Sequence, residues 1–327
     1  MTCRLMTTSI YDCRVESDSI DVTAPVRPDT VLLRDVGPRD GLQAIDDVVS
    51  LDVKIALTNG LVAAGVPRIE AGSFVSPRAV PRMADSRHVF DAMSAGASRE
   101  ALVVNERGAR AAIDADVDVL VGVVSASDTF SHRNVRMSTA DAVAELARII
   151  TVASEAGIPV SVDLSAAFGC AFEGRVGVGA VASVAEQIAH AGAVEIVLAD
   201  TIGAAAPNDI AAVVHEVERR VAPDVRLGLH LHDTRGLALA NATAGLEAGI
   251  RRFDASSGGL GGCPFSPGAT GNVCTEDLVH LFHALGLSTG IDLDELIKVA
   301  GIVEHELGTE LPSRMLRAGP RFAQLAT

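Results

Sequence analysis

Eight short apolar runs, each rich in β-branched residues, alternate along this chain with longer alanine-rich segments. The alternation predicts parallel strands, because each helical connection returns the chain to the same edge of the sheet. Eight such units predict an α/β fold, a (β/α)8 TIM barrel with extra C-terminal helices. The predicted strands are Val31–Val36, Arg68–Phe74, Ala101–Asn105, Val117–Val124, Pro159–Leu164, Glu195–Thr201, Arg226–Asp233 and Arg251–Ser256.

The longer segments have helical spacing of their apolar residues, and several are followed by a glycine suited to a helix C-terminus. Nothing between the predicted elements resembles a linker, so residues 29–327 are expected to form one catalytic barrel domain and residues 1–28 a flexible extension. The predicted helices are Asp52–Ala64, Thr139–Ala156, Val178–Ala191, Asn208–Val221, Leu237–Ala248, Leu278–Leu285 and Leu293–Leu307.

Composition excludes several classes of function. The chain has 327 residues and a net charge of −15, which argues against binding to a nucleic acid. Hydrophobic residues make up 48%, enough for a large core, but no apolar run approaches the roughly 18 residues of a membrane span. The five cysteines show no CxxC spacing, so we expect a reducing, cytoplasmic location.

Polar side chains collect near the ends of the predicted strands, where a barrel carries its chemistry. Arg39 and Asp40 follow the first strand in a turn that contains glycine and proline. His230 and His232 are two residues apart in the seventh strand, so their side chains share one face and can point into the barrel. Glu70 adds a carboxylate to the second strand, where it needs a metal ion or an arginine as its partner.

The loop after the eighth predicted strand, residues 258–272, is rich in glycine and contains a single thiol, Cys263. One interpretation is a plain flexible loop with an inert cysteine. The other is a closing loop, which is where enzymes place groups that must act away from water.

Asp40, His230, His232 and the amide oxygen of Asn272 together offer two oxygen and two nitrogen ligands. Such a set leaves room for two substrate oxygens around a six-coordinate ion. Because it contains no thiolate, it favours Mg²⁺ or Mn²⁺, with Zn²⁺ as an alternative.

With these residues in place, the chain resembles the 3-hydroxy-3-methylglutaryl-CoA (HMG-CoA) lyases, a branch of the DRE-TIM metallolyases, over about residues 30–300. The resemblance implies a barrel domain of the pyruvate carboxyltransferase/HMGL-like type. It rests on ordered motifs spread along one barrel: Val36–Gln43, Ser73–Pro77, Val80–Asp85, Phe168–Cys170 with Glu173-Gly174, Asp200–Gly203, His230–Thr234, Gly261–Pro264, Gly271-Asn272 and Thr275–Val279.

The resemblance also implies roles for the matching residues. It assigns the four-ligand set described above to the metal, with Glu70 supporting the metal shell. Arg39 would face the thioester carbonyl, and Cys263 would handle a proton. Asp200 and Glu276 match acidic positions that organise the site.

The implied reaction is a metal-dependent retro-aldol (Claisen-type) cleavage. HMG-CoA, or a close 3-hydroxy-3-alkylglutaryl-CoA, would give acetyl-CoA and acetoacetate or its homologue. A base, either Asp40 or His230, would take the proton of the C3 hydroxyl. The resemblance further implies an acyl-CoA partner, a homodimer or higher homo-oligomer, and a place in leucine degradation.

Three residues depart from the family pattern and leave the acyl group open. Asp163 stands where the family usually has Tyr, and Arg235 and Leu237 stand where it has Tyr and Gln. Cations that could meet the phosphates of coenzyme A are Arg78, Arg82, His132 and Arg133.

Three alternatives share the barrel. One is a condensing acyltransferase of the isopropylmalate or homocitrate synthase type, and another is a pyruvate aldolase. The Gly-Gly-Cys-Pro loop disfavours both. The third, an inactive scaffold, predicts the loss of a ligand or of Cys263, and none is missing.

Overall fold

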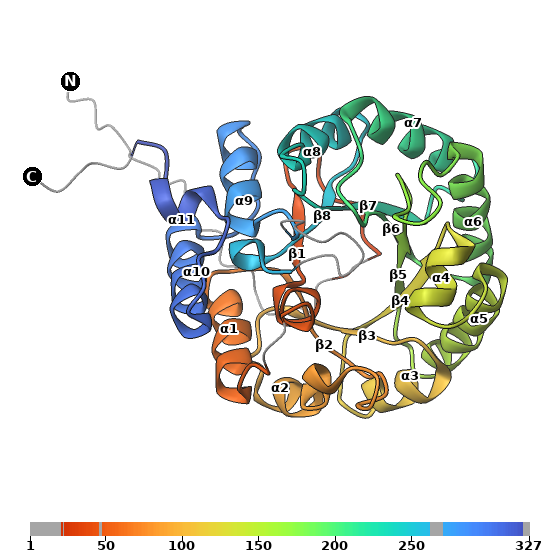
Figure 1. Ribbon diagram of the computed structural model, residues 1–327, viewed down its shortest axis with the longest axis horizontal. Helices are drawn as coiled ribbons and strands as arrows, with labels where there is room; N and C mark the ends of the chain where they lie inside the picture. Colours follow the sequence, from red (N-terminus) through yellow and green to blue (C-terminus); the bar gives the residue numbers. More distant parts are fainter. Residues whose placement is uncertain (1–20, 22, 46–47, 262–270, 323–327) are drawn as a thin grey trace, which may run out of the picture.

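Eight parallel strands close into a barrel in which each strand pairs with the next and β8 pairs with β1 (Figure 1). The structure is a computed structural model that describes residues 21, 23–45, 48–261 and 271–322. The predicted TIM barrel is therefore confirmed. The strands are β1 Leu32–Asp35, β2 Arg68–Ser73, β3 Ser98–Leu102, β4 Val119–Ser125, β5 Val160–Ser165, β6 Glu195–Asp200, β7 Arg226–Leu231 and β8 Arg252–Ala255.

A ring of helices surrounds the barrel, and α10 and α11 lie outside it beside α1 and α9 (Figure 1). Gly65, Gly157, Gly192 and Gly249 follow four of the outer helices with φ between 72° and 105°, as their sequence positions predict. The α-helices are α1 Leu51–Ala63, α2 Ser86–Ala92, α3 Glu106–Ile113, α4 Asp128–Asn134, α5 Thr139–Glu155, α6 Val178–Ala191, α7 Pro207–Glu218, α8 Ala238–Glu247, α9 Thr275–Ala284, α10 Leu293–Leu307 and α11 Arg314–Ala318.

The third strand differs from its prediction, because it begins at Ser98 rather than Ala101 and ends at Leu102. Apolar content locates a strand poorly when its inward residues are polar. Glu100 is fully buried and accepts hydrogen bonds from Arg68, so this polar stretch belongs to the barrel. Asn105 lies beyond the strand and caps α3, since its side chain accepts a hydrogen bond from the Gly108 amide.

The interior of the barrel is ionic, whereas bulky branched residues fill most barrels of this class. Four arginines and six acidic residues form a continuous set of ion pairs from the bottom of the barrel to its mouth, which we call the interior ion network. Its members are Arg34, Arg39, Arg68, Arg252, Asp40, Glu70, Glu100, Asp163, Glu195 and Asp254.

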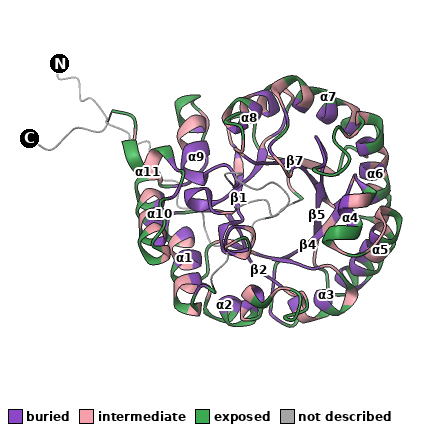
Figure 2. Ribbon diagram, viewed as in Figure 1, coloured by how far each residue is buried: buried purple, intermediate pink, exposed green. Residues whose placement is uncertain are grey.

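The apolar core lies between the strands and the outer helices, as the buried inner faces of the helices in Figure 2 show. Phe282 of α9 is fully buried and packs on Phe253 of β8, with 5.1 Å between the ring centroids. This contact fixes α9 against the strand that precedes the glycine-rich loop.

The end of the predicted N-terminal extension lies against the bottom of the barrel. The Thr23 carbonyl accepts a hydrogen bond from Arg226, and the Ala24 carbonyl accepts one from Arg252. Residues 1–20 lie outside the described residues, so the flexible extension stays a prediction. In the described part of the chain, no helix has the length and apolar character needed to span a bilayer.

Phe282→Ala should lower the free energy of unfolding by about 3–5 kcal/mol, because it removes a large side chain from a close-packed site. Leu285→Ala is the matched control, since this neighbouring leucine is 51% exposed and should cost less than about 1 kcal/mol. Urea unfolding followed by circular dichroism measures both. Equal losses in the two variants would contradict the assigned packing.

Candidate metal centre

A tight turn at the end of β1 carries Asp40 to the mouth of the barrel. Residues Gly37–Gly41 form one π-helical turn in which the Val36 carbonyl accepts hydrogen bonds from the amides of Arg39, Asp40 and Gly41. Gly37 leaves room for this turn, because a Cβ atom here would lie 2.8 Å from the carboxylate of Asp35 and displace it. That carboxylate accepts the Gly37 amide and the Thr275 hydroxyl, so the turn is fixed to the start of α9.

Three side chains meet at the mouth, as the sequence predicted. Ligand atoms of Asp40, His230 and His232 all lie within 4.8 Å of one another. The two Nε2 atoms of the histidines are 3.1 Å apart, so both rings present the same edge to this point. Asn272 joins them, because its backbone bridges to His232 and its Nδ2 donates to Asp40 over 2.8 Å.

Burial and charge set the protonation of this cluster. Burial raises the pKa of Asp40, but Arg39 and the two histidines outweigh it and bring the pKa to about 2. Burial and the neighbouring His230 lower the pKa of His232 to about 4. Burial also lowers the pKa of His230, yet the hydrogen bond and charge of Asp254 leave it raised. The cluster therefore combines an ionised carboxylate with a neutral imidazole, which are the ligand forms that bind metals.

The donor set fits a divalent cation. Asn272 Oδ1, one of the expected ligand atoms, is buried without a hydrogen-bond partner among the described residues. The interior ion network contains four guanidinium groups and six carboxyl groups. With every group ionised, the network carries a net charge of −2. One divalent cation at its upper end would balance this charge. Oxygen and imidazole ligands suit Mg²⁺, Mn²⁺ or Zn²⁺.

Arg39 and Glu70 lie next to the cluster. Arg39 donates from Nη1 to Asp40 and from Nη2 to Glu70, both over 2.7 Å, while its Nε has no partner among the described residues. Burial raises the pKa of Glu70 to about 7 even though Arg39 and Arg34 lower it. The sequence thus predicted correctly that Glu70 would face an arginine or a metal.

Asp254 is a residue that the sequence analysis missed. Its Oδ2 lies 3.2 Å from Nδ1 of His230, and its two oxygens accept hydrogen bonds from Arg34. A carboxylate at the far nitrogen of a metal-binding histidine fixes the ring and its tautomer, leaving Nε2 for the metal. The available signal was its inward position on a strand, two residues after Arg252.

A cavity of about 370 Å³ opens over the cluster. The loops after β2 and β3 and the segment after α4 form its walls, and β5, β6 and β7 contribute its floor. Asp163 and Arg136 line it, and the sequence analysis had not placed Arg136 there. Of the three departures from the family pattern, Asp163 alone is part of the lining, whereas Arg235 donates to the carbonyls of residues 202 and 203.

The remaining predicted residues lie around this centre. Asp200 accepts the amides of Ala204 and Ala205, and Glu276 accepts the amide of Gly258, so both carboxylates hold loop backbone. Cys263 lies outside the described residues. The residues suggested for coenzyme A phosphates are Arg78, Arg82, His132 and Arg133, on two segments that also contribute cavity residues.

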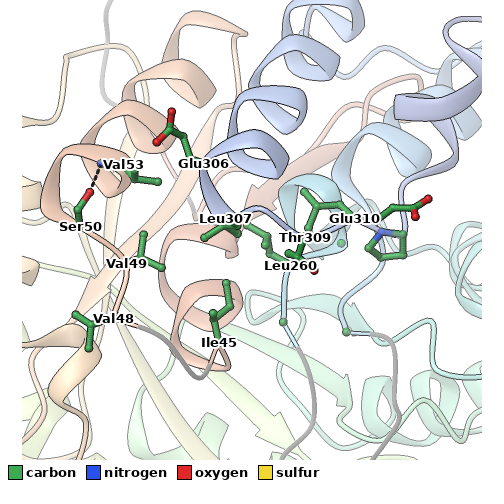
Figure 3. A pocket seen from close by; sticks show the side chains of 15 residues that line it. Ile45, Val48, Val49, Ser50, Val53, Leu260, Glu306, Leu307, Thr309 and Glu310 are labelled. Atoms are coloured by element: carbon green, nitrogen blue, oxygen red, sulfur yellow. Dashed lines mark hydrogen bonds between the residues drawn. The ribbon is translucent and has the colours of Figure 1, made fainter.

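A larger hollow, of about 890 Å³, lies elsewhere (Figure 3). Leu307, Thr309 and Glu310 of the C-terminal region face Ile45 and Val49 across it, and it shares no lining residue with the cavity over the metal cluster. Among the residues that the structure describes, the metal-ligating cluster of Asp40, His230 and His232 does not line this hollow.

Comparisons with known proteins agree with this geometry. The model of the family described as HMGL-like matches residues 30–303. The (R)-citramalyl-CoA lyase of Chloroflexus aurantiacus is 42% identical over 91% of this chain and 98% of its own length. The hydroxymethylglutaryl-CoA lyase of Pseudomonas mevalonii is 43% identical over 86% of this chain and 93% of its own. An HMG-CoA lyase structure from Acinetobacter baumannii, in complex with coenzyme A and 3-methylmalate, has a TM-score of 0.87, 40% identity and coverage of 93% and 100%.

His232→Ala should weaken the affinity for Mn²⁺ by at least roughly 100-fold, because it removes one ligand from the cluster. Asp40→Asn should weaken it as well, since it removes the negative charge of the ligand set. His215→Ala, on an exposed position of α7, is the control and should bind Mn²⁺ normally. Isothermal titration calorimetry measures the affinities, and melting temperatures of the metal-free proteins check the fold. Normal Mn²⁺ affinity in His232→Ala would contradict the site.

Proposed function

This chain belongs to the HMGL-like family, and from that premise we propose that it is a metal-dependent carbon–carbon lyase acting on an acyl-CoA thioester. The observation that supports this most is the cluster of Asp40, His230 and His232 beside Arg39 at the mouth of the barrel. Relatives named as CoA-ester lyases at about 40% identity support the same class of reaction.

The proposed substrate carries a tertiary hydroxyl at C3 and one free carboxylate in addition to the thioester. HMG-CoA or a close 3-alkyl homologue is one candidate, and citramalyl-CoA is the other. The relatives named for these two reactions are 43% and 42% identical to this chain, so identity favours neither. The 3-methylmalate in the related structure is a hydroxy acid with two carboxyl groups, and both candidate substrates are coenzyme A thioesters of such hydroxy diacids.

The residues of the cluster would hold a divalent cation. Such an ion, when bound, supplies Lewis acidity that lowers the pKa of a coordinated hydroxyl group. A base then removes the hydroxyl proton, the C2–C3 bond breaks, and its electrons form the enolate of acetyl-CoA. Asp40 and His230, which both belong to the cluster, are the two candidates for this base.

Arg39 would stabilise the enolate oxygen. Its Nε has no partner among the described residues, and its guanidinium is held by Asp40 and Glu70. A fixed donor aimed at a developing oxyanion contributes roughly 3–4 kcal/mol in comparable sites. The orientation of Arg39 therefore depends on the same carboxylate that belongs to the metal cluster.

The cellular setting is proposed in the same way. Cys170 and Cys274, the described cysteines, are buried and unpaired, which fits a reducing cytoplasm. A homodimer or higher homo-oligomer and a place in leucine degradation stay part of the proposal.

The direct test supplies purified, Mn²⁺-loaded protein with HMG-CoA, 3-alkyl homologues and citramalyl-CoA. We expect acetyl-CoA release from at least one thioester, abolished by EDTA and restored by Mn²⁺. Acetyl-CoA plus a 2-oxoacid, supplied instead, tests the condensing alternative. Condensation without cleavage would overturn the proposed reaction.

Cys263→Ser should lower kcat by roughly 10²–10⁴, the range for a positioned proton donor, while metal and substrate affinities persist. The proposal is that this thiol protonates the enolate carbon. Cys274→Ser is the matched control, because burial and the nearby Glu276 raise the pKa of the Cys274 thiol and leave it inert. Steady-state kinetics of the two variants should differ sharply. Wild-type turnover in both would mean that the proton comes from another group.

A further inference from the structure

The floor of the active cavity contains a carboxylate that the proposed reaction does not use. Asp163 lies on β5 between the guanidinium groups of Arg34 and Arg39. Its Oδ1 accepts a hydrogen bond from Arg34 over 2.7 Å, whereas its Oδ2 is 3.9 Å from the nearest nitrogen of Arg39. Oδ1 is therefore hydrogen-bonded within the interior ion network, whereas Oδ2 has only the longer ion pair with Arg39, and the residue lines the cavity.

Asp163 brings a carboxylate to the floor of the cavity. Among the described residues that line the cavity, Asp40 and Asp163 are the acidic ones, and Asp40 belongs to the metal cluster. The nearby cations are shared with other acids, since Arg34 also pairs with Asp254, and Arg39 lies 2.7 Å from Glu70 but 3.9 Å from Asp163. Arg136 also lines the cavity, but its side chain is exposed to solvent.

A substrate carboxylate meets very different surroundings at the two ends of this floor. Next to Asp40, His230 and His232, a bound cation would balance its charge. Next to Asp163 it would meet a like charge in a buried place, where repulsion is stronger than in water. A carboxylate attached directly to the hydroxyl-bearing carbon stays with the hydroxyl at the metal cluster. A carboxylate on an added methylene reaches further along the floor.

We infer that Asp163 selects substrates by the length of the acid arm, which is the part of the acyl group that carries the free carboxylate. It favours thioesters whose carboxylate is attached directly to the hydroxyl-bearing carbon, and it disfavours those with a carboxymethyl group. The co-product of cleavage is then a 2-oxoacid rather than a 3-oxoacid. This inference rests on the proposed lyase function and chooses between its two candidate substrates.

The experiment compares wild type with Asp163→Asn on two coenzyme A thioesters that both carry a hydroxyl and a methyl group at C3. One bears the carboxylate directly at C3, and the other bears it on a methylene. In wild type, kcat/KM should be at least about tenfold higher for the first. The asparagine keeps the shape and can still accept from Arg34, but it removes the charge. It should lower that ratio at least about tenfold, mainly by raising kcat/KM for the carboxymethyl thioester.

Glu100→Gln is the matched control. Glu100 is also an acidic partner of Arg34, at 3.5 Å, but it is fully buried and does not line the cavity. Glu100→Gln removes the same charge from the same network but leaves the cavity lining unchanged. The ratio of its kcat/KM values for the two thioesters should therefore stay within about threefold of wild type. Asp163→Ser serves as a second replacement if Asp163→Asn does not fold. An unchanged ratio at position 163, or an equal change in Glu100→Gln, would overturn the inference.

A binding measurement separates this inference from the proposed function. Non-cleavable thioether analogues of the two substrates are titrated calorimetrically into Mn²⁺-loaded wild type and Asp163→Asn. Affinity should favour the short acid arm in wild type and lose that preference in the variant. Absence of acetyl-CoA release from both thioesters would overturn the lyase proposal, while the affinity ratio would still decide the role of Asp163.

Discussion

The structure depends on neutralising the buried positive charge of one arginine, Arg34, deep inside the barrel. Arg34 is 1% exposed, and its guanidinium pairs with carboxylates from three other strands, those of Asp254, Asp163 and Glu100. A buried charge costs several kcal/mol unless it is paired and hydrogen-bonded, so these acids must face the interior. An interior filled in this way specifies how the strands are ordered around the barrel, because a changed register would leave charges unpaired.

The same network connects stability to the metal centre. Asp254 holds both Arg34 and the Nδ1 edge of His230, so a pair that neutralises the interior also orients a proposed ligand. Arg39 likewise joins Asp40 to Glu70. Because the network carries two more carboxyl groups than guanidinium groups, we expect the bound cation to complete its charge balance. Metal affinity and the ionisation of Glu70, whose pKa burial raises to about 7, are then coupled.

The sequence predicted the barrel because strand and helix periodicity are local, and the glycines after four outer helices adopt the predicted left-handed conformation. It predicted the cluster of Asp40, His230 and His232 because strand ends converge in a barrel. It misplaced β3, since Glu100 is polar and its partners are distant in sequence. Asp254 was missed for the same reason: the value of a buried carboxylate depends on the arginine that it meets, which no local pattern contains.

The position of Asp163 shows how one residue can serve the fold and the cavity together. Its Oδ1 contributes to neutralising Arg34, and the same side chain lines the cavity. Loss of that charge would still leave Arg34 with Asp254 and Glu100, so the fold depends on Asp163 less than the cavity does. A network with a surplus of acids can therefore vary at the cavity floor while the arginines beneath it stay paired. The substrate range of such a barrel can change by substitution on one strand, because the residues beneath supply the stability.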